Sequence, residues 1–300
     1  MVDQQHIQRL IRGHSDFVTR ANEAELYYKN DNDIKRKGAS PYLDLDIAEK
    51  NPLKIADNRV SHNWHQLLVD QKAGYVLTYP PLFDVGSVKE NEQIAEVLGD
   101  EFCSVSKNLC IAASNCGAAW IHYWMEDGAF QYACVDPRQV IPVFSCDLQE
   151  KLIGVLRTYV YVDNEGKEKR RCEYWDDQTV KFFEEDSDGA YVPFFFPEVG
   201  EEMAHGCGEV PFIMFRNNAH CTSDLRMYKD LIDIYDKVYS GFANDIEDVQ
   251  ELIFVIKNYG GTDKEEFIKE LKLKKVIKVD EDGGVDTIRA EIPHEARSEI

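Results

Sequence analysis

The only cluster of histidine and cysteine side chains in the sequence is His205, Cys207, His220 and Cys221. A zinc site needs pairs of ligands whose spacing lets both members converge on a tetrahedral ion. Here an H-x-C pair is followed, after twelve intervening residues, by an adjacent H-C pair. This does not match the usual spacings, and adjacent side chains tend to point apart. We therefore expect no metal site, and interpret these residues as loop positions that flank a strand.

A nucleophilic thiol is the second chemistry that the residue types suggest. The candidates are Cys116, with His122 as its base, and Cys207. A catalytic thiol needs an electropositive surrounding, which the sequence does not show. On a strand, His122 shares its face with Trp120 and Trp124, so we expect it in a row of packed aromatic rings. An intracellular enzyme that uses Cys116 or Cys207 is kept as an alternative hypothesis.

Nucleotide chemistry finds no support in the sequence. Neither G-x-x-x-x-G-K-[ST] nor G-x-G-x-x-G occurs, so no glycine-rich loop is available to hold phosphates. The chain has 55 carboxylate side chains, so any two of them could be called a catalytic pair, and such a pairing means nothing without a fold. We predict no catalytic residues, no cofactor and a protein that is not an enzyme.

Composition limits the remaining choices. A chain of 300 residues, 44% hydrophobic and 30% charged, is near the size at which one core splits into two or three units. No stretch of eighteen uncharged apolar residues is present, so we expect no membrane span. The eight cysteines lack a C-x-x-C pair and are expected to be reduced thiols. The net charge of −21 repels polyanions, so either DNA is irrelevant to this protein or it must pass without being held.

Periodicity predicts helices before residue 117 and strands after it. Apolar residues recur at helical spacing over 4–28, 58–77 and 91–99. Pro80-Pro81 should stop the second helix, and Gly99 should cap the third. From about residue 117, aromatic and β-branched runs alternate with turn signals such as Glu126-Asp127-Gly128, which predicts an antiparallel meander. Asn217-Asn218 is predicted to be a turn, followed by Ser223 as a helix cap.

The next helix, predicted from Ser223 to about Glu251, carries the clearest pattern in the chain. It would span roughly 40 Å at 1.5 Å per residue. Apolar residues alternate by three and four along it, which is typical of a helix packed along its length on another helix. No earlier segment has a matching seam of that length, so we expect the partner downstream or on another copy of the chain. The seam residues are Leu225, Tyr228, Ile232, Tyr235, Tyr239, Phe242, Ile246, Val249, Ile253 and Ile256.

Beyond the long helix the sequence predicts a small α/β segment. Thr262 and Glu265 form a T-x-x-E capping box for a short helix. KKVIKV and VDTIRAEI are predicted to pair as a hairpin with its turn at Asp282-Gly283. One local basic patch either guards the edge of a strand or faces a nucleic acid or an acidic partner. It consists of Lys272, Lys274, Lys275 and Lys278.

Several segments in order resemble one family, the portal or head–tail connector proteins of tailed bacteriophages with siphovirus-type heads. The resemblance rests on AELYYKNDNDI, NRVSHNWHQLLVDQKAGYVLTYPP, CGAAWIHYW with VDPRQVIPVF and LRTYVY, GEVPFIMFRNN with SDL and KDLIDIYDKV, and GGTDKEEFIKELKLKKVIKVDEDGGVD. It runs from about residue 20 to 296. Each motif alone is weak, and five in sequence are strong evidence.

The resemblance implies an α+β portal fold. Residues 1–222 would form a mixed α/β wing, made of a helical part and an antiparallel meander. Residues 223–251 would form the first stem helix, 252–293 a small α/β clip, and 294–300 the start of a returning stem helix. The rest of the stem, the channel loop and the crown of the family would be absent. The seam would then be sealed by the returning helix and sister subunits, and Asn217 and Asn218 would form a wing–stem hinge.

The same resemblance implies a function at the capsid vertex of a phage or prophage virion, with assembly in the host cytoplasm. Twelve copies would form a ring through which double-stranded DNA passes without sequence specificity during packaging and ejection. Implied partners are the terminase large subunit, a head-completion or adaptor protein, and the major capsid and scaffold proteins. The clip lysines would lie where the packaging motor docks. A second alternative is an adaptor or scaffold protein that pairs with another protein through its long helix.

Overall fold

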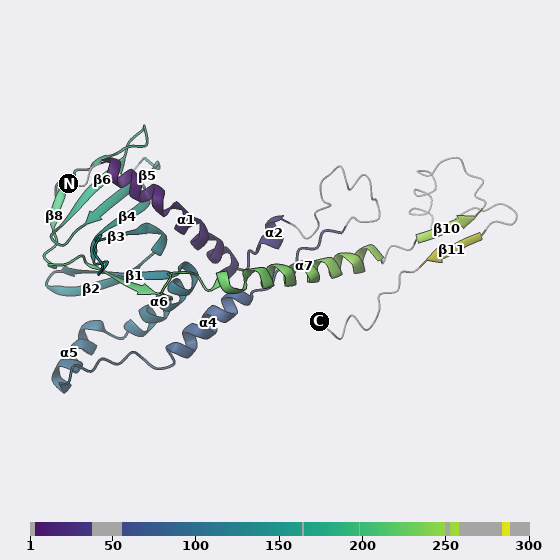
Figure 1. Cartoon of the computed structure of the whole chain (residues 1–300), viewed down its shortest axis with the longest axis horizontal. Helices are drawn as coiled ribbons and strands as arrows, with labels where there is room; N and C mark the ends of the chain where they lie inside the picture. Colours follow the sequence, from purple (N-terminus) through teal and green to yellow (C-terminus); the bar gives the residue numbers. More distant parts are fainter. Residues whose placement is uncertain are drawn as a thin grey trace. The chain divides into compact units, whose positions relative to one another are not determined.

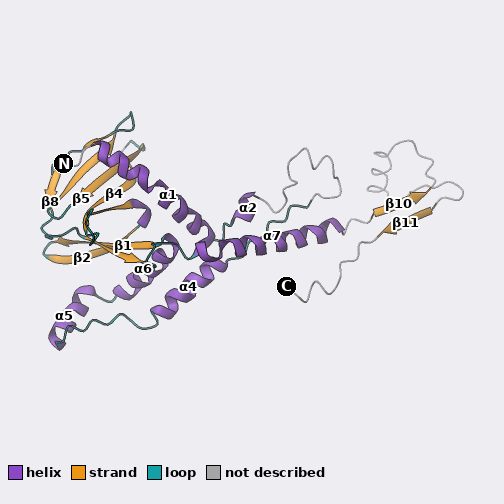
Figure 2. Cartoon of the chain, viewed as in Figure 1, coloured by secondary structure: helices purple, strands orange, loops and turns teal. Residues whose placement is uncertain are grey.

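The computed structural model describes residues 4–37, 56–163, 165–197, 199–249, 253–257 and 284–288. The chain divides into two compact units, Met1–Asn32 with His62–Ile232 and Asp33–Ser61 with Asp233–Ile300. Figure 1 and Figure 2 show a mixed α+β protein with helices and antiparallel sheets, which is the predicted class.

The first unit contains two antiparallel sheets. The first sheet has the order β2-β1-β9, and the second has the order β3-β4-β5-β6-β7 with β8 also paired to β6. A 3-10 turn, η1 (Pro137–Gln139), joins them. The strands are β1 (Ala118–Glu126), β2 (Ala129–Val135), β3 (Val140–Phe144), β4 (Leu152–Val162), β5 (Glu168–Trp175), β6 (Thr179–Glu185), β7 (Tyr191–Pro193), β8 (Glu202–Ala204) and β9 (Phe212–Arg216).

Side-chain alternation along these strands builds the core in layers. One cluster holds Trp120, Val155, Trp175 and Phe212 between the two sheets. Neighbouring residues on the same strands point to the opposite face, because successive side chains of a strand alternate. On the second sheet that outer face packs against helix α1 (Gln4–Tyr28), and on the first sheet it packs against α6 (Phe102–Cys116). Each sheet is therefore covered by a helix on one face and by the other sheet on its second face.

The remaining helices of the first unit are α4 (Trp64–Val76), α5 (Val88–Leu98) and the first two turns of α7 (Leu225–Val249). The predicted helix over 4–28 and the predicted hairpin turn after Glu126 are confirmed, and Gly99 ends α5 at a positive φ of 68°. The helix α6 was not expected, because its sequence is rich in serine, cysteine and other small residues and shows no wide apolar stripe.

The second unit includes α2 (Asp33–Lys37), the rest of α7, and the antiparallel pair β10 (Ile253–Lys257) and β11 (Gly284–Ile288). One expectation is corrected here. Ile253 and Ile256 belong to a strand and not to the long helix, which ends at Val249. The strand at 284–288 pairs with 253–257. Its predicted hairpin partner KKVIKV and the predicted helix after Thr262 lie outside the described residues, so both stay predictions.

The helix predicted from Asn58 begins only at Trp64. Residues 56–63 are not helical, and within the second unit α7 side chains bind the backbone of Asn58 and Val60. The Val60 amide donates to Ser240 Oγ at 2.9 Å, and the Asn58 amide donates to Asn244 Oδ1. Asp236, Ser240 and Asn244 form a buried polar stripe at helical spacing on α7. The periodicity of residues 58–63 gave no sign of these long-range bonds.

Candidate functional site

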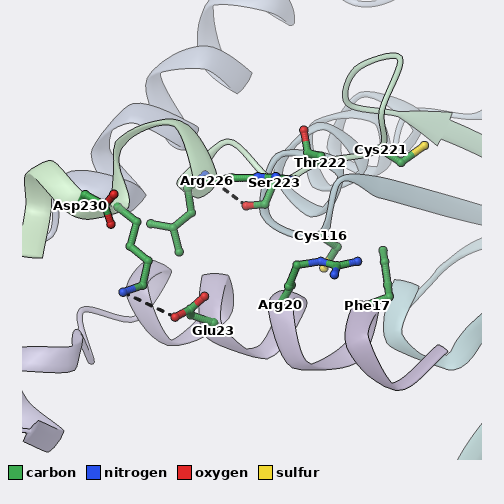
Figure 3. A pocket seen from close by; sticks show the side chains of 11 residues that line it. Phe17, Arg20, Glu23, Cys116, Cys221, Thr222, Ser223, Arg226 and Asp230 are labelled. Atoms are coloured by element: carbon green, nitrogen blue, oxygen red, sulfur yellow. Dashed lines mark hydrogen bonds and ion pairs between the residues drawn. The ribbon is translucent and has the colours of Figure 1, made fainter. Parts of the chain in front are cut away.

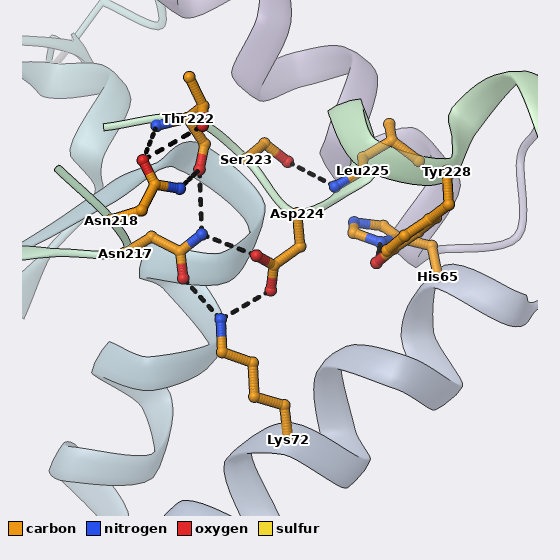
Figure 4. A network of polar contacts seen from close by, with 9 residues as sticks. All are labelled: His65, Lys72, Asn217, Asn218, Thr222, Ser223, Asp224, Leu225 and Tyr228. Atoms are coloured by element: carbon orange, nitrogen blue, oxygen red, sulfur yellow. Dashed lines mark hydrogen bonds and ion pairs between the residues drawn. The ribbon is translucent and has the colours of Figure 1, made fainter. Parts of the chain in front are cut away.

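The passage from β9 into α7 is a corner built from amide side chains (Figure 4). Asn218 Oδ1 accepts hydrogen bonds from the amides of His220 and Thr222, and its Nδ2 donates to the Thr222 carbonyl at 2.8 Å. The left-handed residue of the corner is Cys221, with a φ of 50°, where the sequence suggested the asparagines. Asn217 and Asn218 therefore hold the turn through their side chains, and their role as a hinge stays a prediction.

A half-buried ion pair ties this corner to helix α4. Lys72 Nζ donates to Asp224 Oδ2 at 2.8 Å and to Asn217 Oδ1 at 2.6 Å, while Asn217 Nδ2 donates to Asp224 Oδ1. Burial alone would raise the pKa of Asp224, but the hydrogen bonds from Asn217 and Lys72 and the lysine charge outweigh it and lower the pKa. Asp224 is therefore a charged group at neutral pH that fixes α7 to α4.

Helix α6 closes the corner from another side. The Asp224 amide donates to the Ser114 carbonyl at 2.9 Å, and the Asn217 amide donates to the Gly117 carbonyl at 3.0 Å. Gly117 ends α6 with a φ of 91°, and a Cβ added there would lie 2.1 Å from the Cys221 carbonyl oxygen. Glycine is needed for both reasons, since it tolerates the left-handed backbone and permits the close approach.

The first turn of α7 is capped and packed against α4. Ser223 Oγ accepts from the Leu225 amide at 3.2 Å, which confirms the predicted cap. His65 Nδ1 lies 2.8 Å from the Tyr228 hydroxyl (Figure 4), and the His65 side chain is fully buried. Burial lowers the pKa of His65 to about 4, so the ring is neutral at physiological pH. Lys72, Asp224 and His65 were not predicted as site residues, because no local pattern links residues so far apart.

The predicted seam divides into two parts. Leu225 and Ile232 are buried, at 3% and 5% exposure, in a cluster with Ala24 and Tyr27 of α1, and Tyr228 packs against the same cluster. The expectation that the whole seam needs a partner outside the preceding chain is therefore wrong for these three residues. Further along, Tyr235, Phe242 and Ile246 are half-buried and Tyr239 is 36% exposed. Val249 ends the helix.

A second apolar stripe on α7 was missed. Its members follow the spacing of four, three and four residues that places side chains on one helix face. All four are exposed, with Met227 at 74% and Leu231 at 69%. This spacing can be read from the sequence, but the neighbouring seam is longer, and only the seam was interpreted as a contact face. The stripe consists of Met227, Leu231, Ile234 and Val238.

The thiol candidates lack the surroundings of a nucleophile. Cys116 and Cys221 line a cavity of about 320 Å³ between α1 and the start of α7, and Figure 3 shows the Cys221 sulfur directed away from Cys116. Burial raises the pKa of the Cys116 thiol to about 12, and burial also raises the pKa of Cys207. A catalytic cysteine requires the opposite shift, so the raised pKa values argue against a nucleophilic thiol at either position.

The other polar candidates have structural partners. His122 stacks on Trp124 and Phe212, with ring centroids 5.5 and 4.4 Å apart, as the predicted aromatic row requires. His205 Nε2 lies 3.0 Å from the Asp176 carbonyl oxygen, and its Nδ1 accepts from the Cys207 amide. Within the described residues, no three histidine, cysteine or carboxylate side chains are grouped to hold a metal ion.

Two further sequence predictions can be placed only in part. The four clip lysines, Lys272, Lys274, Lys275 and Lys278, lie outside the described residues, so their role stays a prediction. No helix in the described part of the chain has the length and apolar character needed to cross a membrane.

The described part of the chain thus has the features of a structural protein, with a bonded corner, a long helix and an apolar helix face open to solvent. Comparison with known proteins agrees. The family described as phage portal protein, SPP1 Gp6-like, matches residues 7–300. The portal protein of Clostridium phage phiCD119 is 40% identical over 301 residues, and that of Bacillus phage SPP1 is 35% identical over 276 residues.

These alignments cover 93% and 89% of this chain but 64% and 54% of the two relatives, so the chain spans less than two thirds of either. The chain belongs to the SPP1 Gp6-like family of phage portal proteins, which are structural proteins of the phage capsid and not enzymes. This membership confirms the resemblance noted in the sequence and argues against the thiol-enzyme alternative. Pairing of the long helix with a different protein stays a prediction.

Proposed function

We propose that the chain is a portal subunit that assembles with copies of itself, twelve in the expected ring, at one vertex of a phage or prophage capsid. The ring is the conduit for genome packaging and ejection. Residues 1–222 serve as the wing, 223–251 as the first stem helix and 252–293 as the clip, with 294–300 starting the returning helix. Family membership and the 40% identity to a named portal protein support this proposal.

The exposed stripe on α7 is the observation that carries the self-assembly part. Four large apolar side chains on one face of a single helix are costly to leave in water, at about 25 cal/mol per Å² of apolar surface. The helix already uses another face for α1, so the stripe is free for a neighbouring subunit. Contacts between sister helices would cover Met227, Leu231, Ile234 and Val238.

The charge of the protein supports a role in which DNA passes but is not gripped. The chain carries a net charge of −21, and α7 has six carboxylates against three basic residues over Leu225–Val249. An acidic channel lining releases few counterions from a DNA duplex and so gains little binding free energy from it. DNA can therefore slide past the lining without sequence preference.

Docking partners follow from the same assignment. The terminase large subunit would bind at the clip, where Lys272, Lys274, Lys275 and Lys278 offer a basic patch. A head-completion or adaptor protein, the major capsid protein and scaffold protein would contact the assembled ring. The proposed location is the capsid vertex of the virion, with the host cytoplasm as the site of assembly.

The experiment is to change the stripe in the longest gene product that contains this chain. The triple variant Leu231→Asp, Ile234→Asp, Val238→Asp should abolish ring particles in negative-stain electron microscopy and higher oligomers in native mass spectrometry. The matched control is Leu148→Asp, a fully exposed apolar residue in the turn between β3 and β4. Rings that persist in the triple variant, with a normal circular dichroism spectrum, would refute the proposed contact.

A further inference from the structure

Helix α5 and the loop before it present apolar side chains that nothing in the first unit covers. No residue of α5, which the structure describes throughout, is buried. Leu82 in the preceding loop is 93% exposed, and Val88 in the first turn is 75% exposed. A groove of about 680 Å³ lies along one side of α5, between the loop and the start of α6, and a second of about 630 Å³ lies between α5 and Phe130 of β2.

The groove beside the loop has a fixed floor. The Tyr132 hydroxyl of β2 donates to the Leu98 carbonyl at the end of α5. The Phe102 ring packs against the rings of both Phe83 and Tyr132, with centroids 5.7 and 6.0 Å apart. These contacts hold α5 and the loop on the first sheet, so the groove exists before any partner arrives.

The loop that forms the wall is also held in shape. Asp84 Oδ1 accepts from the Gly86 amide at 2.9 Å and from Asn91 Nδ2, and the Val85 amide donates to Asn91 Oδ1 at 3.0 Å. The Gly86 and Asn91 hydrogen bonds lower the pKa of Asp84, so it is ionised at neutral pH. A preformed groove costs less ordering entropy on binding than a loop that must fold around its ligand.

The rim of the groove is acidic. Asp84, Glu92 and Asp100 line it, and none of the described lining residues is basic. Residues 79–101 contain six carboxylates and one lysine, a density of negative charge well above that of the whole chain. An apolar floor with an acidic rim fits a ligand segment with an apolar side and basic flanks.

We propose that this groove binds an amphipathic helix of another protein, in which lysine or arginine residues flank the apolar face. A second copy of this chain that presented the same groove is the weaker occupant, because the lining offers no basic residue to pair with the opposing acidic rim. The proposal concerns a surface separate from the α7 stripe and holds whether or not the ring forms.

The first test measures binding of a fluorescent leucine–lysine helical peptide to the chain by anisotropy, with a leucine–glutamate peptide of equal length as the probe control. We expect the lysine peptide to bind and the glutamate peptide to bind at least about tenfold more weakly. Equal binding of the two peptides would overturn the proposal.

The second test asks whether the rim is the binding surface. Glu92→Lys with Asp100→Lys should weaken binding of the lysine peptide at least about fivefold. The matched control, Glu165→Lys with Glu168→Lys, makes the same change of net charge at an exposed hairpin between β4 and β5. Equal loss in both variants would show general attraction to an acidic protein and would refute the site.

The third test addresses the apolar floor and the rival occupant. Leu82→Ser with Val88→Ser should weaken peptide binding more than about tenfold, because two large apolar contacts are lost. Leu148→Ser, equally exposed but remote, should leave binding unchanged. Sedimentation of the same proteins without peptide decides the occupant: self-association that Leu82→Ser with Val88→Ser abolishes would assign the groove to a second copy and overturn the proposal.

Discussion

The start of α7 and helix α5 differ in what covers their apolar side chains. Leu225 and Ile232 are buried against α1, at 3% and 5% exposure, whereas no residue of α5 is buried. Both helices are amphipathic in sequence. Helical periodicity therefore identifies an apolar face but does not say whether the same chain, a sister subunit or another protein covers it.

The difference has a physical origin in how each helix is attached. The chain enters α7 through a corner in which Lys72, Asn217 and Asp224 bond to one another, so its first turns are fixed on α1 and α4. Helix α5 is held on the first sheet at its C-terminal end, through Leu98 and the adjoining Phe102, and none of its residues is buried.

The largest expected effect comes from closing the gap at Gly117. Gly117→Ala should lower the free energy of unfolding by about 4 kcal/mol, because the new Cβ would lie 2.1 Å from the Cys221 carbonyl oxygen in a left-handed residue. Gly128→Ala is the control, since Gly128 also has a positive φ but open space around it, and should cost about 1 kcal/mol. Denaturant unfolding measures both. If the two variants lost similar amounts of unfolding free energy, the backbone at Cys221 would be able to move away from position 117 and make room for the new Cβ.

Two adjacent residues of α7 sharpen the comparison further. Ile232→Ser should cost about 3 kcal/mol of unfolding free energy, because it removes a side chain from the cluster with Tyr27. Leu231→Ser, at a position 69% exposed, should cost less than about 0.5 kcal/mol. Both variants are measured by denaturant unfolding at a concentration where the chain is monomeric. A large cost at Leu231 would place the stripe in the chain's own core.

Acid should weaken the α7 corner through His65. Its pKa is lowered to about 4 in the folded protein, so the unfolded state binds more protons between about pH 6.5 and pH 4. The stabilising contribution of the neutral ring is present above pH 6.5 and is lost as the pH falls towards 4, by about 3 kcal/mol in total.

The measurement is the free energy of unfolding across that pH window in the wild type and in His65→Gln. Other buried histidines, including His122, contribute to both proteins, so only the difference between the two curves reports on His65. Parallel curves would mean that His65 is hydrated and titrates normally in the folded state.

The ion pair should matter less than the packing around it. Asp224→Asn keeps the shape of the side chain but removes the charge that faces Lys72, and should cost about 1.5 kcal/mol. Glu25→Gln, which breaks the more exposed pair with Lys29, should cost less than about 0.5 kcal/mol. Thermal unfolding in low and high salt distinguishes them, since only the exposed pair should be screened fully.

The smallest effect is expected on α5. Leu82→Ser should change the unfolding free energy of the monomer by less than about 0.5 kcal/mol, because the side chain is 93% exposed. A loss above about 1 kcal/mol would break the comparison, since it would show that the chain itself covers this residue.

Much of the fold was predictable from local signals. The hairpin at Asp127-Gly128 and the meander of β4 to β7 follow from turn residues between aromatic and β-branched runs, and Ser223 caps α7 as expected. Helix α6 was not predicted, because its small residues pack closely on β1 without forming a wide apolar stripe.

The candidate site was less predictable, because it depends on contacts between distant residues. Lys72 and Asp224 are separated by 152 positions, and His65 and Tyr228 by 163. The cover of Ile232 by α1 is equally non-local, so the seam could be recognised from its spacing while its partner could not.

Helix α7 binds Val60 through hydrogen bonds to its backbone amide and carbonyl groups. Ser240 Oγ accepts from the Val60 amide and donates to the Val60 carbonyl, so the side chain at position 60 contributes nothing to either bond. Most residues should be tolerated there, whereas proline would remove the donor. Inserting or deleting one residue beside Val60 would move the backbone amides away from Ser240 and Asn244, and the hydrogen bonds to them would be lost. This segment should therefore tolerate substitutions far more readily than insertions or deletions.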